Sequence, residues 1–192
     1  MKVLKFGGTS VGSVESIRHI QQIISQQTDD CIVVVSALGG ITDQLLKAAH
    51  LALEAGEEYM EIYQAIRCRH MDMVNTLITN PTTRQMLCLE LESILDELRS
   101  ILFGVHLVKD LSNKTEAAIV SYGERMSSRI VTAALPGAVR KNSLQFIRTE
   151  HKQGQVLLNT ELTEQLIRQV FSPMPHLSVV PGFISRDSQT DE

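Results

Sequence analysis

Two copies of one pattern, a short apolar strand followed by a glycine pair and an amphipathic helix, occupy the first fifty residues of the chain. The first copy has a strand at residues 3–6 and a helix whose apolar side chains recur from Val14 to Ile24. The second has an unbroken, mostly β-branched run at residues 31–35, then a helix that Thr42 is expected to cap. This alternation predicts an α/β fold, and the unbroken run predicts a parallel strand buried on both faces.

The middle of the chain is predicted to be a helical hairpin, over residues 57–102, inserted into the α/β body. Two stripes of apolar side chains at helical spacing fill this segment, and Asn80-Pro81 separates them. Proline starts or stops a helix far more often than it lies inside one, so the turn between the helices is placed there. The methionines of these stripes are interpreted as core-filling side chains.

The last third of the chain predicts two more helices and two more strands. Helical spacing covers residues 115–135, where Gly123 interrupts the apolar pattern at a cost of about 1 kcal/mol relative to alanine. Residues 144–147 and 177–180 are predicted strands, and residues 160–171 are predicted to form another amphipathic helix. The elements together predict an α/β fold with helices on the faces of a mainly parallel sheet.

The composition excludes several classes of partner. Of the 192 residues, 43% are hydrophobic and 21% are charged, which is ordinary for a globular protein. The formal charge of −4 argues against nucleic-acid and membrane-surface binding, because both require a basic face. No apolar run approaches the roughly 20 residues that span a bilayer, and no signal peptide is recognised. Scattered cysteines and histidines fit no metal-binding spacing, so no metal ligand is assigned and a reducing cytoplasm is expected.

The first candidate site is the glycine pair that ends the first strand, in the segment Lys5-Phe6-Gly7-Gly8-Thr9-Ser10. Glycines without Cβ atoms let backbone N–H groups close around an anion, and the following helix adds a partial positive charge. Lys5 can supply a full positive charge and Ser10 a hydroxyl donor. These features together predict a phosphate site, and a plain tight turn is the alternative.

The second candidate site, residues 36–43, follows the strand at residues 31–35 and carries the second glycine pair. Open α/β sheets bind ligands at the carboxyl ends of their strands, so Ser36 and Thr42 are candidate ligand contacts. The alternative is that Thr42 serves only as a helix cap.

The third candidate is Glu124, which lies beside the apolar positions of the helix predicted at residues 115–135. A carboxylate that points inward is costly unless it is paired, so a site built to receive an ammonium group would account for it. The alternative is an ordinary surface ion pair between Glu124 and Arg129.

Taken in order, these segments resemble the aspartate kinases, a branch of the amino acid kinase family. The opening K-F-G-G-T-S at residues 5–10 is highly specific to them. Residues 33–43 are similar to their block V-V-S-A-x-x-G-V-T-N, and residues 121–127 to their block S-x-G-E-x-x-S. Residues 181–184 match a turn written Q-G-F-I in the family. The opening and residues 102–105 look most like bifunctional enzymes fused to homoserine dehydrogenase.

The resemblance implies the family's three-layer α/β/α sandwich with a mainly parallel sheet. It also implies phosphoryl transfer from MgATP to the side-chain carboxylate of L-aspartate, giving 4-phospho-L-aspartate, a step that opens lysine, threonine and methionine biosynthesis. Mg²⁺ arrives with the nucleotide, and no protein ligand is assigned to it. In this scheme Lys5 holds the ATP phosphates and stabilises transition-state charge. The implied phosphate-binding residues are Lys5, Phe6, Gly7, Gly8 and Ser10. The implied substrate-binding residues are Ser36, Thr42 and Glu124, with Glu124 on the amino group.

The chain departs from the family pattern in ways that shape the expectation. The family's later G-R-G-G-S-D segment is absent, so residues 1–192 are expected to be the N-terminal portion of the catalytic domain and inactive alone. Asp43 replaces a commoner asparagine and Gly39 a commoner serine. The full-length protein is expected to be a homo-oligomer. Two alternatives stay open: a related kinase acting on another acid, or a non-catalytic assembly module that pairs through residues 57–102.

Overall fold

The structure is a computed structural model that describes residues 1–54, 56–152 and 155–189. Across these ranges, no helix combines the length and the apolar character needed to cross a membrane. The helices are α1 (Val14–Ser25), α2 (Ile41–Leu51), α3 (Glu58–Leu77), α4 (Pro81–Val108), α5 (Asn113–Ala134) and α6 (Thr160–Val170), with a 3₁₀ turn at Ser143–Gln145. The strands are β1 (Lys2–Phe6), β2 (Cys31–Val35), β3 (Val139–Arg140), β4 (Arg148–Lys152), β5 (Gln155–Leu158), β6 (Leu177–Pro181) and β7 (Arg186–Asp187).

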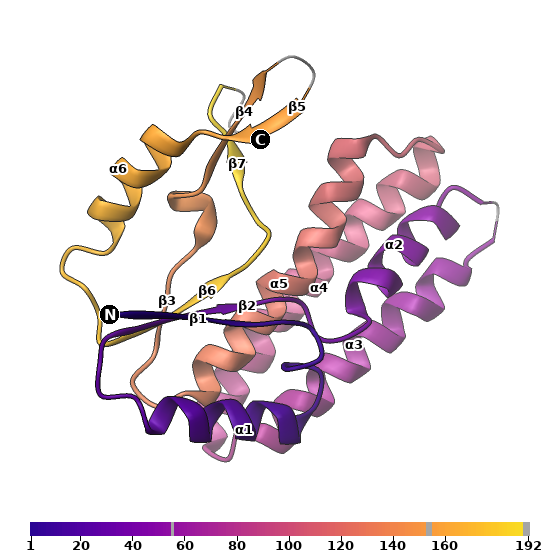
Figure 1. Ribbon diagram of the computed structural model, residues 1–192. Helices are drawn as coiled ribbons and strands as arrows, with labels where there is room; N and C mark the ends of the chain where they lie inside the picture. Colours follow the sequence, from indigo (N-terminus) through magenta and orange to yellow (C-terminus); the bar gives the residue numbers. More distant parts are fainter. Residues whose placement is uncertain (55, 153–154, 190–192) are drawn as a thin grey trace.

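The main sheet is parallel, in the strand order β1-β2-β6-β3 (Figure 1). Its register places Phe6, Val35 and Pro181 side by side, so the three longer strands end level with one another. Backbone hydrogen bonds continue the ladder one residue further, from Ser36 N to Phe6 O (3.1 Å) and from Gly182 N to Val35 O (2.8 Å). The loops that follow these strands therefore meet at one edge, where open α/β sheets bind ligands.

Helices α1 and α5 cover one face of the main sheet, as Figure 1 shows with the strands nearly edge-on. Successive side chains of a strand point to opposite faces. In β2, Cys31, Val33 and Val35 are buried on the helical side, whereas Ile32 and Val34 are only half-buried on the other. The prediction that this strand is buried on both faces is therefore wrong for the described residues. The opposite side carries α6 and a second sheet of order β5-β4-β7.

The predicted strand at residues 144–147 is also wrong, because this segment forms a 3₁₀ turn and β4 begins directly after it. The side-chain oxygen of Asn142 accepts the N–H of Leu144 at 3.2 Å, and the N–H of Ile147 donates to the carbonyl oxygen of Ser143 at 2.7 Å. A local asparagine bond thus offers the backbone an alternative to the sheet ladder, which alternating hydrophobicity over four residues cannot reveal.

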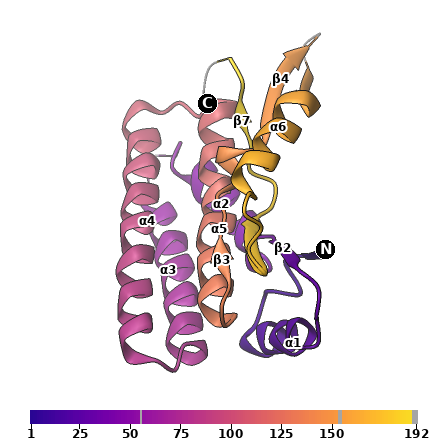
Figure 2. The same cartoon turned by 90° about the vertical axis from the view of Figure 1, so that its left-hand side faces the viewer.

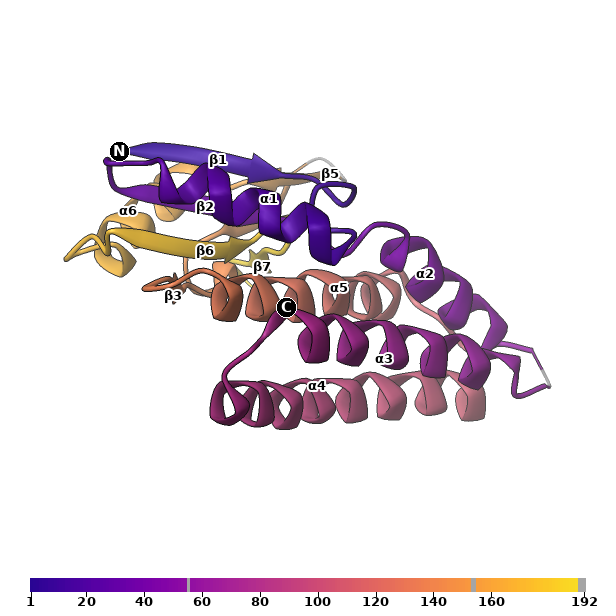
Figure 3. The same ribbon diagram turned by 90° about the horizontal axis from the view of Figure 1, so that it is seen from below.

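Helices α3 and α4 are antiparallel and stack beside α5, with α4 outermost (Figures 2 and 3). The Asn80 side chain caps α4 by accepting the N–H of Thr83 at 3.0 Å, and Pro81 is the first helical residue. Proline fits there because the first N–H groups of a helix have no partner within the helix. Helix α4 continues beyond Leu102 to Val108, further than the apolar stripe suggested.

His70 in α3 is fully buried, and this has a measurable consequence for stability. Its Nδ1 lies 2.7 Å from the carbonyl oxygen of Ile66, and its Nε2 has no partner among the described residues. Burial lowers the pKa of His70 from 6.5 to about 4. The unfolded state therefore binds the proton first on acidification. We expect the free energy of unfolding to fall by about 3 kcal/mol as the pH drops from neutrality to about 4.

Urea unfolding across this pH range measures the effect, and substitution H70F is expected to flatten the dependence. Because other groups also titrate, the comparison is with H19N, which removes an exposed histidine from α1 and should leave the dependence unchanged. An H70F protein whose stability falls with acid as steeply as that of the wild type would show that His70 is not responsible.

Candidate active site

The loop at residues 7–12, hereafter the first glycine loop, connects β1 to α1. The carbonyl oxygen of Gly7 accepts the N–H groups of Ser10 (2.9 Å) and Val11 (3.2 Å), which closes the turn. Ser13 then caps α1 by accepting the N–H of Ser16 at 3.1 Å. The local sequence therefore turns the chain sharply from strand end to helix start, and the loop lies at the carboxyl edge of the sheet.

The second glycine loop, residues 36–40, packs directly on the first. A Cβ atom added to Gly39 would stand 3.0 Å from the carbonyl oxygen of Gly8, and one added to Gly12 would stand equally close to it. These glycines are therefore required for the approach of two backbones. Gly7 differs, because a Cβ atom there would meet nothing within 4 Å. Packing does not demand glycine at position 7, and the space beside it is open.

Helix α5 holds the second glycine loop through three contacts. The N–H of Ala37 hydrogen-bonds to the Glu124 carboxylate, and the hydroxyl of Ser127 donates to the carbonyl oxygen of Ser36 at 2.7 Å. The third contact is steric, because Gly123 faces Ala37 so closely that a Cβ atom on it would lie 2.6 Å from the Ala37 Cβ. The glycine inside this helix is therefore a packing requirement of the loop.

We expect G123A to destabilise the protein by about 1–2 kcal/mol, because overpacking outweighs the gain of about 1 kcal/mol in helix propensity. The matched control is G104A in the interior of α4, where an added Cβ meets nothing within 4 Å and should stabilise. Urea unfolding of both variants measures the difference. A stabilising G123A substitution would mean that α5 and the second glycine loop can move apart at no cost in stability.

Thr42 does not cap its helix, contrary to the sequence prediction. Helix α2 begins at Ile41, and its N-cap is Gly40, whose φ of 78° lies in the left-handed region. Glycine adopts this conformation without steric cost. Because it has no side chain, the helix has no side-chain cap. Thr42 is instead the second helical residue, and its position leaves it available to a ligand.

A pocket of about 470 Å³ opens between the two glycine loops and α5. It brings together four residues predicted as site residues from separate segments: Gly8, Ser36, Thr42 and Glu124. The remaining lining residues are Ala37, Leu38, Gly39, Gly40, Ala117, Val120, Ser121 and Phe183. The other predicted residues, Lys5, Phe6, Gly7 and Ser10, do not line this pocket.

Lys5 lies beside the pocket, next to Phe183, for which the sequence predicts no role in the site. Its Nζ stands 5.9 Å from the centre of the Phe183 ring, and Phe183 lines the pocket. The Phe183 side chain is 96% exposed, and its φ of 55° is a left-handed conformation that non-glycine residues rarely adopt. The available signal was the P-G-F-I turn, which marks the segment but does not show that its ring is exposed.

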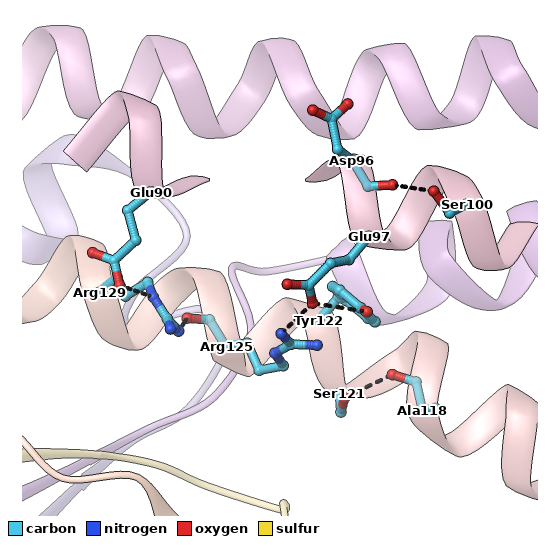
Figure 4. A network of polar contacts seen from close by, with 9 residues as sticks. All are labelled: Glu90, Asp96, Glu97, Ser100, Ala118, Ser121, Tyr122, Arg125 and Arg129. Atoms are coloured by element: carbon cyan, nitrogen blue, oxygen red, sulfur yellow. Dashed lines mark hydrogen bonds and ion pairs between the residues drawn. The ribbon is translucent and has the colours of Figure 1, made fainter. Parts of the chain in front are cut away.

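Glu124 is 7% exposed and faces the pocket without a positive partner. Burial raises the pKa of its carboxyl group, and the hydrogen bond from Ala37 only partly offsets this. In the part of the chain that the structure describes, no basic side chain forms an ion pair with it. The alternative of a Glu124–Arg129 pair is wrong, because Arg129 Nε donates to Glu90 of α4 at 2.5 Å (Figure 4). A buried carboxylate of this kind can receive a ligand cation or a proton.

Residues 1–191 match the model of the amino acid kinase family, so the chain belongs to this family. The relatives that it matches include aspartokinases and bifunctional aspartokinase/homoserine dehydrogenases. Aspartokinase 2, chloroplastic, of Arabidopsis thaliana is 33% identical over 137 residues, which cover 69% of this chain and 24% of that protein. Bifunctional aspartokinase/homoserine dehydrogenase 2 of Escherichia coli is 27% identical over 96% of this chain and 23% of its own length. The chain thus spans about a quarter of these relatives.

The fold is that of a solved relative. Aspartokinase III of E. coli, crystallised with lysine and aspartate, superposes with a TM-score of 0.83 at 25% identity. The match covers 97% of this chain and 41% of that one. The expected mainly parallel α/β architecture of the amino acid kinases is therefore confirmed.

Proposed function

We propose that the chain forms the aspartate- and phosphate-binding part of an aspartate kinase, which phosphorylates the side-chain carboxylate of L-aspartate with ATP. One observation carries the proposal: the buried, unpaired Glu124 carboxylate faces a pocket whose opposite wall is made by two glycine loops. An amino acid offers an ammonium group to the carboxylate. Its reacting carboxylate then extends toward the glycine loops, where backbone N–H groups suit phosphate.

Aspartate is held by three side chains in this proposal. Glu124 binds the ammonium group, and Ser36 and Thr42 contribute polar atoms from the adjacent pocket wall. The pocket is large enough for one small amino acid, since ligand sites commonly measure about 300–1,000 Å³. The solved relative aspartokinase III of E. coli was crystallised with aspartate, which supports this choice of ligand.

The phosphate side is assigned to the first glycine loop. A carboxylate oxygen of aspartate attacks the γ-phosphorus of ATP, the bond from that phosphorus to the bridging oxygen breaks, and ADP leaves with the electron pair. Gly7, Gly8 and Ser10 donate hydrogen bonds to the transferred group, with Phe6 leading into the loop, and Lys5 neutralises charge on the phosphates. The open space at Gly7 supports this assignment, because a side chain there would occupy the approach to the loop. Mg²⁺ is proposed to enter bound to the nucleotide.

The test is a coupled ADP-release assay. Because the chain spans about a quarter of its curated relatives, the assay uses a longer chain that contains it, beside the 192-residue chain. We expect turnover with aspartate by the longer chain and little by the shorter one, because the shorter chain lacks the family's G-R-G-G-S-D segment and the charge-neutralising groups expected there. Turnover with glutamate or acetylglutamate instead would identify a related kinase. No turnover with any of the three would refute the proposal.

A second function, self-association in a homo-oligomer, is favoured by the outer face of α4. Met86, Leu89, Phe103 and Leu107 are exposed there at spacings that place them on one helix face. A partner copy would cover them. We expect the double variant L89E/F103E to lower the solution mass of a cytoplasmic aspartate kinase containing this chain. An unchanged mass would exclude this face as the interface.

A further inference from the structure

A second hollow, of about 540 Å³, lies at the other end of α5, between α4, α5 and β3. We call it the arginine pocket. Its lining residues are Thr83, Met86, Leu87, Glu90, Arg129, Thr132, Ala133 and Arg140. None of them belongs to the proposed aspartate or phosphate site. The hollow is of the size of a small-molecule site, and its two arginines favour a negatively charged ligand.

Glu90 and Glu97, the two glutamates of α4 that lie beside α5, already have partners, as Figure 4 shows. Arg129 Nε donates to Glu90 at 2.5 Å, and another guanidinium nitrogen of Arg129 donates to the carbonyl oxygen of Arg125 at 2.7 Å. Arg125 in turn donates to Glu97 at 2.7 Å, and Glu97 also accepts the hydroxyl of Tyr122 at 3.3 Å. Glu97 therefore balances Arg125, and Glu90 balances Arg129.

Arg140 of β3 is the arginine left over. It is half-buried, and its pKa is lowered first by burial and then by the positive charge of Arg129, with Glu90 acting in the opposite direction. Within the described ranges its guanidinium group forms no hydrogen bond or ion pair. Three arginines thus face two carboxylates, and one guanidinium with five N–H donors stands partly desolvated at the pocket wall.

We propose that the arginine pocket binds a small anion, a phosphate or carboxylate group, between Arg140 and Arg129. Both groups match the planar fork of a guanidinium, and either would supply the missing negative charge. Thr83 adds a hydroxyl, while Met86, Leu87 and Ala133 leave apolar wall for a short hydrocarbon portion of the ligand. The site does not depend on the proposed kinase activity, since it shares no residue with that pocket.

The test titrates the ¹⁵N-labelled 192-residue chain with inorganic phosphate and, separately, with succinate, followed by amide NMR. We expect saturable shifts at Thr83, Thr132 and Ala133, which distinguish this pocket from phosphate bound at the first glycine loop. The anion that saturates at lower concentration identifies the preferred chemistry. Absence of saturable shifts at these amides with both anions, up to tens of millimolar, would overturn the proposal.

Two arginine variants separate a site from general charge. R140Q is expected to weaken binding at least about tenfold, because a charge-assisted hydrogen bond is lost. R99Q removes an exposed arginine from α4 that does not line the pocket and should leave the affinity unchanged. R140K, which keeps the charge but loses the fork, should fall between R140Q and the wild type and provides a folded comparison if R140Q is unstable. Equal affinities of R140Q and R99Q would overturn the assignment.

Discussion

Replacing Glu124 with glutamine is expected to weaken aspartate binding by about a hundredfold, or about 3 kcal/mol. The proposed bond joins an ammonium group to a carboxylate that is almost fully buried. Such bonds are strong, and losing the carboxylate leaves the ammonium group desolvated without compensation. Calorimetric titration of the folded variant with aspartate measures the loss.

The pH dependence sharpens this test. Burial raises the pKa of Glu124, so the free carboxyl group retains its proton to a higher pH than an exposed glutamate does. Because the ammonium group binds the ionised form, aspartate affinity should rise as the pH rises through that pKa. Without ligand, the raised pKa means that the folded state binds the proton more tightly. Stability is therefore lost as the pH rises above 4.5 toward the folded value.

Both dependences should disappear in E124Q. The control is E116Q, which removes a carboxylate of the same helix that pairs with His50 and does not line the pocket. Should E124Q bind aspartate as tightly as E116Q does, Glu124 is not the ammonium site.

Replacing Lys5 with methionine is expected to lower turnover of the longer kinase chain by about a hundredfold or more while aspartate affinity changes little. Lys5 is exposed at the end of β1, outside the pocket lining but beside Phe183 at its edge. That position suits a group which neutralises phosphate charge and makes no contact with aspartate. Steady-state kinetics with each substrate varied, together with aspartate titration, separates the two effects.

Lys2 provides the matched control for Lys5. It belongs to the same strand, but at the opposite end, where its Nζ pairs with Asp29 at 3.5 Å. K2M should retain turnover within a few-fold of the wild type. If K5M retains turnover as K2M does, Lys5 does not neutralise charge on the ATP phosphates.

Much of the fold is predictable from local pattern. The strands and glycine pairs at the start of the chain and the long helices follow from apolar spacing and from residues such as Asn80-Pro81. The wrong predictions concern segments whose structure is set by a local side-chain hydrogen bond or by a left-handed backbone conformation. Asn142 turns an apolar stretch into a 3₁₀ turn, and the left-handed Gly40 takes the cap position expected for Thr42. Neither is visible as hydrophobic periodicity.

The site was less accessible to sequence reasoning because its geometry is tertiary. A glycine within a helix looks unfavourable until Ala37 is found against Gly123. The Glu124–Arg129 alternative was reasonable until the structure placed Arg129 against Glu90. The exposure of Phe183 was not predictable from the sequence either, because it depends on the path of the chain between β6 and β7.

The level strand ends at Phe6, Val35 and Pro181 restrict how this family member can vary in length. One residue inserted into β2 would advance Ser36 by about 3.3 Å. It would also turn each later side chain of that strand to the opposite face of the sheet. Insertions and deletions should therefore be tolerated at the tip between α3 and α4, where residues 79–81 are exposed, and rejected within the strands. A library of single-residue insertions, selected for growth that requires aspartate phosphorylation, would map this boundary along the chain.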